Sequence, residues 1–171
     1  MRALLAMAPL MGMITIAGSA SAAPAVHAHD LTLTGAVIRA TPPGVSTTGG
    51  YLTIANAGAK SDRLVSVSCT CASMVMLHAT VMHMGMATMT DPGFIAIPAH
   101  GQAQLTPGGY HLMLMGLKAP PQDGSTQAMT LRFERAGAVV VPFAVNARIQ
   151  AEPAKPARPA MPAMPGMAMP H

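Results

Sequence analysis

The feature that most constrains the fold of this chain is a series of short apolar runs, interrupted at close intervals by glycine and proline. The clusters that separate the runs include Pro42-Pro43-Gly44, Gly49-Gly50, Asp91-Pro92-Gly93 and Pro107-Gly108-Gly109. Short strands at such spacing predict an all-β sandwich or barrel. Because no stretch keeps a helical apolar period, we expect little helix. The predicted strands cover residues 31–34, 51–54, 64–67, 74–78, 94–97, 102–105, 110–117, 128–133 and 138–145.

Residues 1–22 have the layout of a secretory signal peptide. Arg2 is followed by an uncharged apolar run and then by the small residues Ala20-Ser21-Ala22, which suit signal peptidase. The run ends at Gly18, short of the roughly 20 apolar residues that a membrane span needs. We therefore expect cleavage after residue 22 and a periplasmic mature chain without stable membrane insertion. No cysteine precedes Cys69, so we expect no lipid anchor near the N-terminus.

The composition changes at Arg148, after which alanine, proline and methionine dominate. Such a segment buries too little apolar surface to offset the entropy lost on ordering. We therefore expect residues 148–171 to form a disordered C-terminal tail. The folded part is then one β domain at residues 30–147.

Charge and composition exclude some classes of function. The formal net charge is +4 and aromatic residues make up only 3% of the chain. The basic residues form no stripe that could follow a phosphate backbone, so we expect no nucleic-acid partner. Carboxylates are few and no Ser-His-Asp-like arrangement is present, so we expect that the protein is not an enzyme.

Methionine is the anomaly of the composition, with 17 in 171 residues. Protein cores use methionine as an occasional gap-filler, and a disordered tail has no core to fill. Packing therefore does not explain these residues. Outside the signal peptide they cluster in one hairpin-sized region (Met74, Met76, Met82, Met84, Met86 and Met89), in a later run (Met113 and Met115) and in the tail (Met161, Met164, Met167 and Met169).

Soft-ligand chemistry does explain them. A thioether suits Cu(I) and suits hard cations poorly, and unlike a thiol it is not lost to disulfides in an oxidising compartment. His78 and His83 lie within the first cluster, and His111 lies beside Met113. On a strand, His111 and Met113 leave the same face, while Leu112 leaves the other. The pattern predicts a copper site.

At these positions the sequence resembles a known family. His78 is followed by 10 residues and Met89, then by 21 residues, His111, one residue and Met113. This is the His-x10-Met-x21-His-x-Met pattern of the periplasmic copper chaperones called PCu(A)C. The string from Pro107 to Leu117 resembles them as well, and the likeness extends over about residues 35–145.

The resemblance implies more than the spacing alone. It implies a cupredoxin-like Greek-key β-sandwich that binds Cu(I) at His78, Met89, His111 and Met113. It also implies delivery of copper to an acceptor such as the CuA-bearing subunit of cytochrome c oxidase. The tail resembles Met- and His-rich extensions of the family, thought to hold additional copper, here Cu(I) with Cu(II) as an alternative. Its candidate ligands are Met161, Met164, Met167, Met169 and His171.

Several alternatives stay open at this stage. Cys69 and Cys71 are compatible with a local disulfide, with auxiliary copper ligands or with two unpaired thiols. The residues Met82, His83, Met84 and Met86 either bind copper or merely line the site. The protein could also sequester copper for tolerance without delivering it. If cleavage fell after Ala28, His29 would become an N-terminal copper ligand of an enzyme. A blue-copper carrier lacks the compact Cys-His-Met run that it requires.

Overall fold

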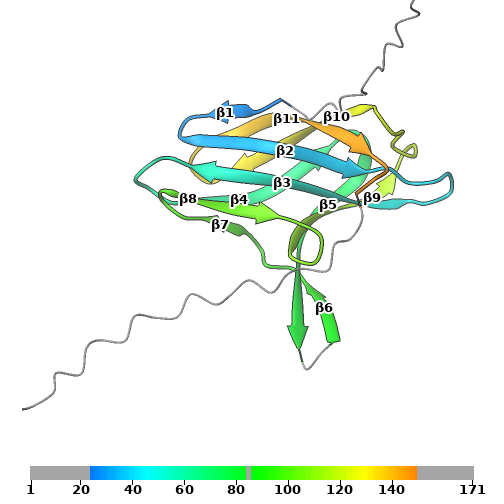
Figure 1. The fold of residues 1–171 in the computed structure, drawn as a ribbon, viewed down its shortest axis with the longest axis horizontal. Helices are drawn as coiled ribbons and strands as arrows, with labels where there is room; N and C mark the ends of the chain where they lie inside the picture. Colours follow the sequence, from blue (N-terminus) through cyan, green and yellow to red (C-terminus); the bar gives the residue numbers. More distant parts are fainter. Residues whose placement is uncertain (1–23, 84–85, 150–171) are drawn as a thin grey trace, which may run out of the picture.

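The computed structural model describes residues 24–83 and 86–149, which form an 11-stranded mixed sheet without a helix (Figure 1). The all-β prediction is confirmed. The described residues contain no helix long and apolar enough to cross a lipid bilayer. The strands are β1 (Val26–Ala28), β2 (Leu31–Arg39), β3 (Thr47–Asn56), β4 (Asp62–Cys69), β5 (Ala72–His83), β6 (Met86–Thr90), β7 (Ile95–Ile97), β8 (Gly101–Leu105), β9 (Tyr110–Leu117), β10 (Thr126–Phe133) and β11 (Gly137–Asn146).

The strands follow the order β6-β5-β9-β8-β3-β2-β11-β10-β4-β7, with β1 paired to β2 and an additional pairing of β9 to β3. Most neighbours are antiparallel, whereas β11 with β2 and β8 with β9 are parallel. The sheet folds over on itself, because β4 contacts β5 and β7 contacts β8, although these strands do not pair. Figure 1 shows the resulting two layers.

The space between the layers is filled by one apolar core. Burial alternates strictly along β3, as expected for a strand with one face inward. Among the residues that the structure describes, Met129 is the only methionine in this core, and it is fully buried. The largest fully buried side chains are Phe143, Leu33, Ile38, Leu52, Ile54, Leu64, Ile95, Ile97, Leu105, Leu112, Leu114 and Met129.

The prediction that Gly49-Gly50 separates two strands is wrong, because both residues lie inside β3. A Cβ at Gly49 would come within 2.6 Å of the Tyr51 hydroxyl oxygen. The missing side chain therefore leaves room for the Tyr51 ring, which is a known role of glycine within a strand.

Strand β5 is longer than predicted and belongs to two parts of the molecule. From Ala72 to Ala79 it pairs with β9. From Ala79 to His83 it pairs with β6, and this β5–β6 hairpin projects from the body (Figure 1).

Cys69 and Cys71 form a disulfide at the turn between β4 and β5. The turn brings their Cα atoms to 5.2 Å, closer than the roughly 6.5 Å of an extended segment. Of the three interpretations left open by the sequence, the structure has the local disulfide. The described residues contain no free cysteine.

Candidate metal site

The four residues picked out by spacing lie on one face of neighbouring strands. His78 on β5 is directly opposite His111 on β9. Met89 on β6 is opposite Thr80, two residues beyond His78 along β5. Because side chains alternate along a strand, His78, Met89, His111 and Met113 all leave the same face. The predicted orientation of His111 and Met113 is confirmed.

Three of the four also line one cavity of about 400 Å³, namely Met89, His111 and Met113. The end of β2, the following loop and the start of β3 also line the cavity and contribute Arg39, Thr41 and others. His78 does not line it, but its ring centroid lies 5.7 Å from that of His111, with the two rings perpendicular.

The hydrogen bonding of His111 determines which of its nitrogens is free. The ring is buried, and its Nδ1 lies 3.1 Å from the Gly109 carbonyl oxygen. A carbonyl only accepts hydrogen bonds, so in the neutral ring this contact assigns the proton to Nδ1 and leaves the Nε2 lone pair free. Histidine ligands of metals are commonly oriented by this kind of bond.

Two buried polar atoms without a hydrogen bond belong to residues around the site. Among the described residues, the only buried side-chain nitrogen or oxygen atoms without a hydrogen bond are His78 Nδ1 and Thr41 Oγ1. Thr41 lines the cavity, and His78 stands edge-on to His111. Buried polar groups normally have partners, so these two atoms indicate a place for a ligand.

The donor set fits a soft monovalent ion. Two imidazoles and two thioethers are all neutral donors, and no carboxylate lines the cavity. The described residues also contain no group of three or more His, Cys, Asp or Glu side chains that could hold a metal. Hard cations take oxygen ligands, whereas thioethers select Cu(I).

The charges around the cavity agree with this selection. Burial raises the pKa of Tyr51, against a smaller opposing effect of Arg39, so its phenol is neutral at physiological pH. Arg39 and Tyr51 both line the cavity. A fixed positive charge without a compensating anion repels a divalent ion twice as strongly as a monovalent one.

The methionines around the site are mostly solvent-exposed. Five of them are exposed, and Met89 on the edge strand β6 keeps 61% of its surface in solvent. Packing in the core therefore does not account for them. The exposed ones are Met74, Met82, Met86, Met89 and Met115, while Met76 and Met113 are partly buried.

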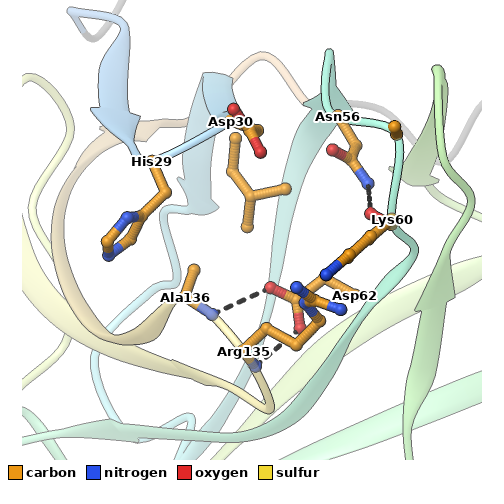
Figure 2. A pocket seen from close by; sticks show the side chains of 9 residues that line it. His29, Asp30, Asn56, Lys60, Asp62, Arg135 and Ala136 are labelled. Atoms are coloured by element: carbon orange, nitrogen blue, oxygen red, sulfur yellow. Dashed lines mark hydrogen bonds between the residues drawn. The ribbon is translucent and has the colours of Figure 1, made fainter.

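A second cavity of about 400 Å³ lies at the other end of the β2–β3 pair (Figure 2). There the buried Asp62 carboxylate accepts hydrogen bonds from the backbone N–H groups of Arg135 and Ala136, at 2.9 and 3.0 Å. His29 lines this cavity, but no second histidine and no sulfur atom does. The carboxylates that share this cavity with His29 are those of Asp30 and Asp62, which are oxygen donors.

Some predicted residues lie outside the described part of the chain. These are the signal peptide at 1–22, Met84, and the tail candidates Met161, Met164, Met167, Met169 and His171. Conversely, Thr41 and Tyr51 were not selected as site residues from the sequence, because they come from a distant segment that the fold brings to the site.

Comparisons with known proteins agree with the fold and bear on the site. The family model "Putative lipoprotein LpqE-like" matches residues 31–145. The "Putative lipoprotein Lxx21020" of Leifsonia xyli subsp. xyli is 40% identical over 92 residues, 53% of this chain and 55% of that protein. The chain therefore spans about half the length of this curated relative.

Solved structures give longer matches. The solution structure of CuI-DR1885 from Deinococcus radiodurans is 32% identical, with a TM-score of 0.59, over 80% of this chain and 87% of that one. The apo PCuAC domain from PmoF1 is 26% identical, with a TM-score of 0.63, over 72% and 99%. The copper-bound PCuAC domain from PmoF2 is 25% identical, with a TM-score of 0.63, over 72% and 98%. The chain has the cupredoxin-like fold of these domains.

Proposed function

This chain belongs to the LpqE-like family of PCuAC-type domains, and from that premise we propose that it is a copper chaperone. It carries Cu(I) as cargo on His78, Met89, His111 and Met113. The observation that carries the proposal is the convergence of two imidazoles and two thioethers on one sheet face, beside a cavity whose Thr41 hydroxyl has no hydrogen-bond partner. Two of the similar structures are of copper-containing forms, the copper-bound domain of PmoF2 and CuI-DR1885, which supports the choice of ion.

Release is supported by the exposure of one ligand. Met89 lies on β6, at the end of the strand order, and is 61% exposed. An acceptor can therefore approach the ion from the hairpin side. Copper then passes by stepwise ligand exchange, in which acceptor thiolates displace the more weakly donating thioethers.

The acceptor that we propose is a copper centre such as the CuA site of a cytochrome c oxidase subunit, reached in the periplasm after removal of residues 1–22. Related proteins named as lipoproteins support a place in the cell envelope. The tail methionines and His171 hold additional Cu(I) or Cu(II). The protein acts as a carrier rather than as an enzyme.

A transfer experiment tests delivery against the alternative of sequestration. Cu(I)-loaded protein is mixed with an apo CuA domain, and the copper content of each is measured after separation under anaerobic conditions. We expect most of the copper to move to the acceptor, since thiolates bind Cu(I) more tightly than thioethers. Retention of copper by this protein, with both partners folded, would favour sequestration instead.

A further inference from the structure

The sheet face that carries the candidate site continues beyond it with more methionines. In the register of β5 with β9, Met76 is opposite Met113 and Met74 is opposite Met115. These rows follow the His78–His111 row at steps of two residues, so all six side chains leave the same face. Met74 and Met115 are 57% and 37% exposed.

The backbone beneath this outer pair is held firmly. Val75 and Leu114 point to the other side, and Leu114 is fully buried in the core. Next to the pair, the Ser73 hydroxyl donates to the Gly116 carbonyl oxygen at 3.1 Å. Gly116 has a left-handed φ of 64°, where a Cβ would come within 2.7 Å of the Ser73 hydroxyl oxygen. The backbone that carries the exposed thioethers of Met74 and Met115 is therefore well ordered.

The geometry allows both sulfurs to meet on one ion. Residues directly opposite across an antiparallel pair have Cβ atoms about 4.5–5.5 Å apart. Methionine has three rotatable bonds, so the two sulfurs can converge between the strands. Met76 in the intervening row can turn its sulfur toward either neighbour.

We propose that Met74, Met76 and Met115 form a second, weaker site for a soft monovalent ion. Its outer row, Met74–Met115, lies about 13 Å along the sheet face from the His78–His111 row, the length of four residues on a strand. The proposal rests on the proposed function only in naming Cu(I) as the natural ion. Copper that arrives from solvent binds first to Met74 and Met115. It then passes by way of Met76 and Met113 to His78 and His111.

The probe for the test is Ag(I), a redox-stable soft monovalent ion. It is titrated into the full chain labelled with ¹³C at the methionine methyl groups, and each signal is assigned by substitution to leucine. We expect the Met89 and Met113 signals to shift with the first equivalent, and those of Met74, Met76 and Met115 to shift with later ones.

The double variant Met74→Leu with Met115→Leu keeps the apolar surface but removes two thioethers. We expect the affinity of the second site for Ag(I) to fall by at least about tenfold. Removing a residue that only supports a metal ligand already costs that much, and these two residues are themselves ligands. Binding at the first site stays within about twofold in this variant. Met86→Leu, on the opposite face of the hairpin, is the control and leaves both steps unchanged.

The outcomes separate this inference from the proposed function. Static Met74 and Met115 signals at saturation, or a double variant that binds like the parent, overturn the second site. In that case the exposed pair is an apolar contact surface for a protein partner. Static Met89 and Met113 signals, with Met74 and Met115 shifting, overturn the first site and leave the second one standing.

Discussion

The His111 ring is buried, and its Nδ1 is hydrogen-bonded to a backbone carbonyl, which leaves Nε2 free to bind a metal. Its spacing from Met113 was enough to predict that both leave one face of a strand, and the burial of Leu112 and Leu114 confirms it. The bond to Gly109 was not predictable, because it depends on the turn that precedes β9. Nor was the opposition of His78 and His111, since the register between β5 and β9 is not set by a local pattern.

For a single residue, we predict that Met113→Ile lowers the Cu(I) affinity but leaves the stability of the fold nearly unchanged. Isoleucine keeps the apolar volume of a partly buried strand position but has no sulfur. The free energy of unfolding of the apo protein should therefore change by less than about 1.5 kcal/mol. The Cu(I) affinity, measured by competition with a chelator, should fall by at least about tenfold.

The control for this variant is Met129→Ile. Met129 is the fully buried methionine of the core and faces no ligand. It should lose some stability in urea unfolding and keep the parent Cu(I) affinity. If both variants lost affinity equally, Met113 would act through the fold and not as a ligand.

At the level of secondary structure, the local sequence pattern predicted some strands correctly and missed others. The predicted run at 110–117 coincides with β9, because Gly108-Gly109 precedes the apolar run and Lys118 follows it. Strands β1 and β6 were not predicted as separate strands: β1 has three residues, and all of β6 is solvent-exposed, so neither has a buried stripe. Strand β5 was predicted too short, since its outer half pairs only with β6.

Two similarly exposed methionines of the β5–β6 hairpin, Met89 and Met86, allow a matched pair of substitutions. Met89 and Met86 are 61% and 68% exposed, and three residues apart on β6 they leave opposite faces. We expect Met89→Leu to lower the Cu(I) affinity by at least about tenfold, and Met86→Leu to leave it within about twofold. Both exposed substitutions should change the free energy of unfolding by less than about 0.5 kcal/mol.

Chelator competition and urea unfolding of the two variants provide the measurement. Equal losses of affinity would mean that the whole hairpin, and not the thioether of Met89, holds the ion. No loss in either variant would remove Met89 from the ligand set.

For the whole molecule, the sequence predicted the all-β class because that class depends on many short runs rather than on any one of them. It did not predict how the sheet closes, which sets Arg39, Thr41 and Tyr51 beside Met89 and His111. Such contacts join segments far apart in the chain, and each depends on the path of the whole sheet. The neutral donors and Arg39, the one cation that lines the cavity among the described residues, then favour a monovalent soft ion over a divalent one.

The central claim is that one Cu(I) ion binds between His78, Met89, His111 and Met113. Anomalous diffraction at the copper edge, from crystals of the protein loaded with one equivalent of Cu(I), tests it most directly. We expect one dominant peak within bonding distance of both imidazoles and both thioethers. A dominant peak elsewhere, or one that touches neither His78 nor His111, would contradict it.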